Sequence, residues 1–131
     1  MKINEPVIFD TSVVVAMLRR EDDVVQAIVP YSQVHITVTV LGELYYGAYH
    51  SSKVSYHLAE CALVEDKFPL HNHSQQTARM YGEVKARLRT TGRVIPENDM
   101  WIAAVAIEHK STLITRDRHF ERVRGLSVVV L

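Results

Sequence analysis

Cysteine is nearly absent from this chain of 131 residues, because Cys61 is the only one. A single thiol cannot form an internal disulfide, so the fold has no disulfide framework and the composition fits a reducing compartment. Its apolar, helical surroundings favour a packed thiol. Long apolar runs are absent as well, since no stretch approaches a membrane span or the core of a secretory signal. We therefore expect a cytoplasmic protein with no membrane partner.

The chain also lacks an excess of charge, since 15 Lys and Arg balance 15 Asp and Glu. It therefore has no overall electrostatic attraction for nucleic acid. The charges are unevenly distributed: residues 1–66 hold 4 basic against 9 acidic residues, whereas residues 67–131 hold 11 against 6. Basic side chains gather over 79–93 and 116–124. These two stripes fit solvated helix faces, and they equally fit contacts to phosphates beside an acidic metal site.

Short apolar segments rich in β-branched residues alternate along the chain with longer helical patterns. The expected strands cover 7–9, 34–38, 68–70, 111–115 and 126–131. The expected helices cover 13–18, a segment capped by Asp22 or Asp23 and ending near Pro30, 39–49, 53–65, 75–91 and 99–107. This alternation predicts an α/β fold with a mainly parallel central sheet covered on both faces. The length is most simply that of a single domain spanning residues 1–131.

Capping residues predict several of the helix boundaries. Ser52 and Ser74 are candidate N-caps, and Gly92 is placed to end the helix that follows Ser74. Asn98 is a good N-cap for the stretch 100–107, which is apolar on every side. That stretch is too short to span a membrane, so it predicts a helix buried inside the domain.

Four acidic residues fall at equivalent points of this pattern. Asp10 and Asp117 each follow an expected strand, whereas Glu43 and Asp99 lie near the starts of expected helices. In a parallel sheet, the carboxyl ends of strands and the amino ends of the following helices share one rim, so the four acids can converge there. Each acid also has a simpler explanation when it is taken alone, as a helix cap, a turn or a solvated helix face.

Carboxylates gathered at one rim repel one another, and a divalent cation relieves that repulsion. Carboxylate and water oxygens suit Mg²⁺ or Mn²⁺, whereas zinc prefers Cys and His. A carboxylate-held Mg²⁺ can bind a phosphate oxygen and activate water. His71 and His73 form a His-x-His pair that could also bind a metal, although loop histidines usually do not. No glycine-rich phosphate loop occurs, which argues against an enzyme that uses ATP.

Four segments carry a resemblance to a known family: IFDTSVV (8–14), LGELYYGA (41–48), IPENDMWIAAVAI (95–107) and LITRDRHF (113–120). In this order, and across nearly the whole chain, they resemble the PIN-domain ribonucleases, in particular the VapC-type toxins of toxin–antitoxin pairs. The resemblance implies a three-layer α/β/α sandwich, a homodimer and Mg²⁺-dependent endonucleolytic cleavage of RNA. It also implies a cognate antitoxin that blocks the acidic groove.

The resemblance assigns metal-binding and catalytic roles to the same four acids: Asp10, Glu43, Asp99 and Asp117. Thr11 and Thr115 match hydroxyl positions beside that site, where they would support the acids. Many relatives carry Ser or Thr three residues before the Glu, and this chain has Val40 there. A hydroxyl from that helix is therefore not expected.

Two other interpretations remain open at this point. An Asp after a strand also occurs in phosphatases and phosphotransferases of the haloacid-dehalogenase type, but their chemistry needs a second Asp where this chain has Ser12. The other interpretation is a PIN fold that binds a partner and cleaves nothing. Metal-dependent cleavage of RNA by the pure protein distinguishes these possibilities.

Overall fold

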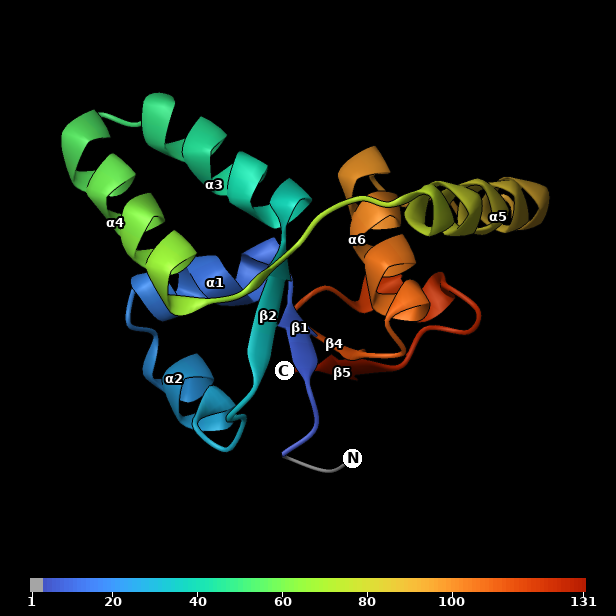
Figure 1. Ribbon diagram of the computed structural model, residues 1–131, viewed down its shortest axis with the longest axis horizontal. Helices are drawn as coiled ribbons and strands as arrows, with labels where there is room; N and C mark the ends of the chain where they lie inside the picture. Colours follow the sequence, from blue (N-terminus) through green and yellow to red (C-terminus); the bar gives the residue numbers. More distant parts are fainter. Residues whose placement is uncertain (1–3) are drawn as a thin grey trace.

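The computed structural model describes residues 4–131, and within them it contains one five-stranded sheet (Figure 1). Its strands are β1 (Val7–Phe9), β2 (Val34–Thr37), β3 (Leu70–His71), β4 (Thr112–Thr115) and β5 (Val128–Val130). Every neighbouring pair is parallel, in the order β3-β2-β1-β4-β5. The central strand β1 is buried throughout, as expected for a parallel sheet that is covered on both faces.

The helices are α1 (Thr11–Leu18), α2 (Asp22–Ile28), α3 (Val38–Tyr49), α4 (Val54–Lys67), α5 (Gln75–Thr91) and α6 (Glu97–Glu108), with a 3₁₀ turn η1 (Arg118–Arg122). Helices α1 to α4 lie on one side of the sheet, and α5 and α6 lie on the other (Figure 1). The predicted three-layer α/β/α sandwich is therefore confirmed. Between residues 4 and 131, no helix combines the length and apolarity that crossing a bilayer requires.

Helix α6 is the most deeply buried helix of the fold. Residues 102–106 are 0% exposed, because α6 lies between the sheet and α5 and also contacts α3. Three of these five residues are alanine, which allows close approach of the neighbouring backbones. The buried helix predicted from the stretch 100–107 is therefore confirmed.

The boundaries predicted for α5 are also confirmed. The Ser74 hydroxyl accepts a hydrogen bond from the Thr77 amide, and the Thr77 hydroxyl accepts one from the Ser74 amide, so the two residues form a capping box. Gly92 ends the helix with φ of 68°, a left-handed conformation that glycine adopts without steric cost.

Other predicted boundaries are wrong by one to three residues. Helix α6 begins at Glu97 because the Pro96 carbonyl accepts hydrogen bonds from the amides of Asp99 and Met100, at 3.0 and 3.2 Å. Asn98 therefore lies inside the first turn and is not the N-cap. Helix α4 starts after Lys53, and Ser52 does not cap it.

Strands β3 and β5 lie at 70–71 and 128–130 instead of the predicted 68–70 and 126–131, and α1 begins at Thr11 instead of 13 because Asp10 caps it. Two further helix starts follow the same rule as those of α6 and α4. Glu21, whose carbonyl accepts from the Val25 amide at 2.9 Å, precedes α2, so Asp22 and Asp23 lie in its first turn. Strand β2 ends at Thr37, because the Thr37 hydroxyl accepts from the Val40 amide and starts α3. In each case a backbone carbonyl or a neighbouring hydroxyl starts the helix, which residue preferences alone do not specify.

The strand order reverses between β1 and β4, which defines the switch point of the sheet. From β1 the chain proceeds outward through β2 to β3, then returns to the other side of β1 for β4 and β5. In open α/β sheets, ligands bind outside the carboxyl ends of the strands at this point. The topology therefore places the candidate site where β1 and β4 end.

The two serines predicted as caps provide a matched test of this fold. Ser74→Ala removes the N-cap of α5 and its hydrogen bond to Glu108, so we expect a loss of about 1 kcal/mol of unfolding free energy. Ser52→Ala removes a similar hydroxyl that caps nothing and should change stability by less than about 0.5 kcal/mol. Urea unfolding of both variants measures the difference, and equal losses would contradict the assignment of caps.

Candidate active site at the carboxyl ends of β1 and β4

Asp10 lies at the centre of the candidate site, where β1 ends and α1 begins. Its side chain is nearly buried and caps α1 by accepting a hydrogen bond from the Val13 amide at 3.1 Å. The same carboxylate oxygen accepts from the Ser12 hydroxyl at 2.7 Å, and the other oxygen accepts from the Thr115 hydroxyl at 2.5 Å. Asp10 is therefore both a helix cap and a carboxylate at the switch point.

Asp99 reaches the site from the first turn of α6, on the opposite side of the sheet from α1. One of its carboxylate oxygens lies 2.8 Å from Nε2 of His119, which belongs to η1. The side chain of Asp99 is 17% exposed, so it is accessible from the rim although it is mostly covered. The helix start and His119 both place positive character beside this carboxylate.

Glu43 reaches the site from α3, and its contact comes from α1. The Thr11 hydroxyl donates to Oε1 of Glu43 at 2.6 Å. The expected hydroxyl contact at Thr11 is therefore present. Val40, which stands where many relatives have a hydroxyl, is fully buried in the core. Thr11 thus gives Glu43 a hydroxyl partner that does not come from its own helix.

Asp117 is the most exposed of the four acids, just after β4. Its amide donates to the Thr115 hydroxyl at 3.0 Å, and the Arg116 amide donates to the Ser12 hydroxyl at 3.0 Å. The two hydroxyls that hold Asp10 therefore also hold the backbone that follows β4. The contact expected at Thr115 is present, and Ser12 adds a second one.

The pKa values show that the four acids form one electrostatic group, which we call the carboxylate rim. The pKa of Asp99 is raised to about 6: burial raises it most, the negative charges of Glu43 and Asp10 also raise it, and His119 opposes the rise. Burial also raises the pKa of Asp10, more than its hydrogen bonds lower it, and the charge of Asp117 adds to the rise. Ionisation of Asp10 and Asp99 therefore costs more free energy in the folded protein than in the unfolded chain.

The acids do not converge on one point in this conformation. Among residues 4–131, no group of three or more His, Cys, Asp or Glu side chains is arranged to hold a metal ion. Glu43 is engaged by Thr11, and Asp99 is engaged by His119. The donor set nevertheless fits Mg²⁺, because its acids offer only oxygen and Mg²⁺ in proteins commonly keeps several waters while one or two carboxylates hold it.

Two further side chains contact rim acids and were not predicted from the sequence: Ser12, which contacts Asp10, and His119, which contacts Asp99. A hydroxyl two residues after Asp10 is compatible with the local hydrogen bond that it forms, so Ser12 had a weak local signal. His119 had none, because its partner Asp99 is 20 residues away and belongs to another element.

The possible His-x-His metal site is not formed. His71 stacks between His35 and His109, with ring centroids 4.7 and 4.0 Å apart, and burial together with these two rings lowers the pKa of His71 to about 4. His73 instead stacks on Trp101, at 4.8 Å. The two histidines therefore belong to separate ring stacks.

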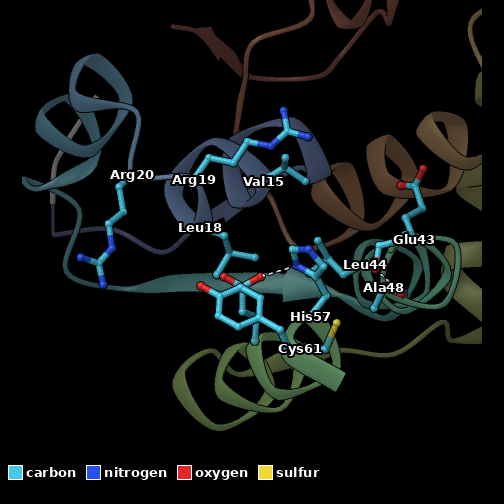
Figure 2. Close-up of a pocket in the computed structure, with 13 residues that line it drawn as sticks. Val15, Leu18, Arg19, Arg20, Glu43, Leu44, Ala48, His57 and Cys61 are labelled. Atoms are coloured by element: carbon cyan, nitrogen blue, oxygen red, sulfur yellow. Dashed lines mark hydrogen bonds and ion pairs between the residues drawn. The ribbon is translucent and has the colours of Figure 1, made fainter. Parts of the chain in front are cut away.

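A pocket of about 550 Å³ opens beside the rim, between α1, α3 and α4 (Figure 2). Its apolar lining comes from all three helices: Val15, Leu18, Leu44, Ala48 and Cys61. Figure 2 shows Glu43 at one end of this lining, on the same helix as Leu44 and Ala48. The thiol of Cys61 is buried, as predicted, and burial raises its pKa. The pocket therefore joins an apolar surface to one acid of the rim.

Four basic residues of the two stripes pair with acids on the surface: Lys85, Arg87, Arg116 and Arg118. Arg116 contacts Glu21 at 2.9 Å, and Lys85 contacts Glu97 at 3.1 Å. Arg87 also lines a second pocket of about 330 Å³ between α5 and the end of η1, together with Arg122 and Arg124. Solvated helix faces account for most of the pattern, and this pocket is where positive charge is concentrated.

Residues 7–126 match the family model of the PIN domain. This match agrees with the fold and with the position of the candidate site at the switch point of the sheet. The chain therefore belongs to the PIN-domain family. The resemblance inferred from the sequence is thereby confirmed. The haloacid-dehalogenase alternative is excluded.

Within this family the chain is similar to VapC proteins. It is 30% identical over 125 residues to ribonuclease VapC2 of Haemophilus influenzae, covering 89% of this chain and 91% of that protein. It superposes with a TM-score of 0.80 and 28% identity on VapBC-5 of Mycobacterium tuberculosis, from the VapBC family of toxin–antitoxin systems, over 96% of this chain and 98% of that chain. It also superposes on VapBC2 of Rickettsia felis, solved bound to a promoter DNA fragment, with a TM-score of 0.87 and 23% identity, over 97% of this chain and 99% of that chain.

The raised pKa of Asp99 predicts how the metal-free protein responds to pH. The unfolded chain ionises this group near its ordinary value of 3.8, whereas the folded protein does so at about 6. The protonated carboxyl thus stabilises the fold below about pH 4, and this contribution is lost as the pH rises through about 6. In EDTA, wild type should lose stability relative to Asp99→Asn as the pH rises from about 4 to about 6. Urea unfolding tests this, and a pH-independent difference would contradict it.

Proposed function

We propose that this protein is a divalent-metal-dependent endoribonuclease that acts as the toxin of a toxin–antitoxin pair. The observation that carries the proposal is the carboxylate rim at the switch point, where burial and, to a smaller extent, the charges of Glu43 and Asp10 raise the pKa of Asp99. Crowded carboxylates of this kind are typical of sites that need a cation. The proposal is supported by the ribonuclease names of the VapC relatives.

The metal is proposed to be Mg²⁺, with Mn²⁺ also accepted, and the residues proposed to hold it are Asp10 and Asp99, with Glu43 and Asp117 completing the site. Bound there, the ion would supply Lewis-acid stabilisation of the phosphodiester and an activated water. The chain's own residues orient the acids for that task. Thr115 and Ser12 fix both oxygens of Asp10, and His119 holds Asp99 toward η1.

The proposed partner is a cognate antitoxin that covers the rim from the apolar pocket. The pocket suits an apolar helix, because five apolar side chains from three helices line it. Glu43 at its end suits a basic side chain, which would be drawn toward the other acids of the rim. VapBC-5, at 28% identity, is a member of a toxin–antitoxin family, which supports the same kind of partner here.

Several expectations stay predictions: the homodimer, the cytoplasmic location and the single domain over residues 1–131. The alternative of a PIN fold without catalysis also stays open to experiment. It is disfavoured because all four acids are present and two of them have raised pKa values, which a pure binding module has no reason to keep.

Replacement of a proposed metal ligand tests the enzyme directly. Asp10→Asn and Asp99→Asn keep the side-chain shape but remove the charge, so RNA cleavage by the purified protein with Mg²⁺ should fall at least about 100-fold. Asp66→Asn removes an exposed acid of α4 far from the rim and should cleave as wild type does. Full RNA cleavage by either rim variant would overturn the assignment of Asp10 and Asp99 as metal ligands. No RNA cleavage by wild type would favour a PIN fold that only binds a partner.

Thermal melts with EDTA and with Mg²⁺ test the metal separately from catalysis. For an assumed dissociation constant of about 0.1–1 mM, about 10 mM Mg²⁺ should stabilise the native protein by roughly 1.4–2.7 kcal/mol, which is several degrees in melting temperature. Asp99→Ala relieves repulsion at the rim, so without metal it should be at least as stable as wild type. It should also lose most of the gain from Mg²⁺. An equal gain in both proteins would show that Asp99 is not a ligand.

A further inference from the structure

Three aromatic rings from three different segments form a continuous stack beside the carboxylate rim. His73, in the loop between β3 and α5, stacks on Trp101 of α6 with centroids 4.8 Å apart and planes 13° from parallel. Trp101 stacks in turn on Tyr81 of α5, at 3.9 Å and 4°. Nζ of Lys85 donates to the Tyr81 hydroxyl at 3.2 Å and lies 5.6 Å from the centroid of that ring. We call the three rings the aromatic ladder, and His73 is its free end.

The ladder is connected to the rim through two helices, because α6 carries both Trp101 and Asp99 and α3 carries both Glu43 and the Thr39 that contacts His73. Trp101 is two residues from Asp99 on α6. On α3, the Thr39 hydroxyl hydrogen-bonds Nε2 of His73 at 3.0 Å, and Thr39 lies four residues before Glu43, about 6 Å along the helix. Figure 1 shows the loop that carries His73 running between the starts of α3 and α6. His73 is therefore fixed beside Thr39, about one helical turn from Glu43 along α3.

His73 is exposed, yet two contacts orient its ring, and core packing does not explain them. Its ring is oriented on one face by Trp101 and at its edge by Thr39, yet its side chain remains open to solvent. Within residues 4–131 no other ring stacks on its outer face. An aromatic ring whose orientation is already fixed loses little conformational entropy when a ligand stacks on it.

We propose that the outer face of His73 is a stacking site for an unpaired nucleobase of the RNA substrate, next to the phosphodiester held at the rim. This proposal rests on the proposed ribonuclease function and adds a binding subsite to it. Every nucleobase has a flat π-face, so such a site selects single-stranded RNA over duplex without reading a particular base. The base would become the fourth member of the ladder.

The chain provides its own reporter for this site, since Trp101 is its only tryptophan. A base that stacks on His73 extends the ring system containing Trp101 and should change its fluorescence. Binding is measured in EDTA with the Asp10→Asn protein as parent, so that no cleavage occurs. The probes are single-stranded oligoadenylate of about ten nucleotides and an abasic oligomer of the same length, which keeps the sugar and phosphates and lacks the bases.

Oligoadenylate should change the fluorescence of Trp101, and the abasic oligomer should change it little. Replacing His73 by Ala in the parent should weaken binding of oligoadenylate about 5- to 160-fold, which corresponds to ~1–3 kcal/mol, with little effect on the abasic oligomer. His73→Tyr retains a flat ring and should restore most of the affinity. His50→Ala is the matched control, because His50 also stacks on a ring, that of Tyr46 at 5.5 Å, but at the far end of α3. It should bind as the parent does.

Equal affinity of the His73→Ala protein and its parent for oligoadenylate would overturn the stacking site while leaving the proposed function intact. Equal binding of oligoadenylate and the abasic oligomer by the parent would do the same. A loss of affinity only for a partner protein would instead assign the ladder to the antitoxin and refute an RNA site. Failure of the proposed function would look different, as no binding of either oligomer by the parent together with no cleavage of RNA by wild type.

Discussion

A carboxylate buried between the ends of two parallel strands is the constraint on which the rest of this structure depends. Asp10 is 2% exposed, and burial raises its pKa in spite of the hydrogen bonds that it accepts. Such a group is tolerable only where donors surround it. Here they come from both sides of the switch point, from Ser12 and Val13 after β1 and from Thr115 at the end of β4. The need to satisfy one acid therefore fixes how β1, α1 and β4 meet.

The other acids are brought to Asp10 by elements that are held for different reasons. Asp99 is positioned by α6, whose burial between the sheet and α5 leaves its first turn no freedom to move away. Glu43 is positioned by α3, and Thr11 ties it to the helix that Asp10 caps. The hydrophobic core thus stabilises an arrangement of like charges that the charges themselves oppose. Residues that lower the stability of a fold in this way are typical of a functional site.

Sequence alone predicted what depends on local chemistry and periodicity. Ser74 as a cap and the buried character of α6 were predictable because each rests on one residue type or one apolar run. The placement of Asn98 as a cap failed because the Pro96 carbonyl accepts the first helical hydrogen bonds, and backbone geometry of that kind is not encoded in residue preference. The placement of the four acids at one rim of the sheet could be predicted from the order of strands and helices. The contact of His119 with Asp99 and the stacking on Trp101 could not, because they join residues far apart in sequence.

The hydrogen bond between Thr115 and Asp10 spans 105 residues of sequence, and this separation determines when the candidate site can form during synthesis. Strand β1 and Asp10 are synthesised early. Strand β4, which pairs with β1, and the Thr115 hydroxyl that donates to Asp10 are synthesised almost a whole domain later. A domain generally folds as a unit, so every nascent chain that ends before β4 has an incomplete rim. The proposed active site can therefore form only when nearly all of the fold has been translated.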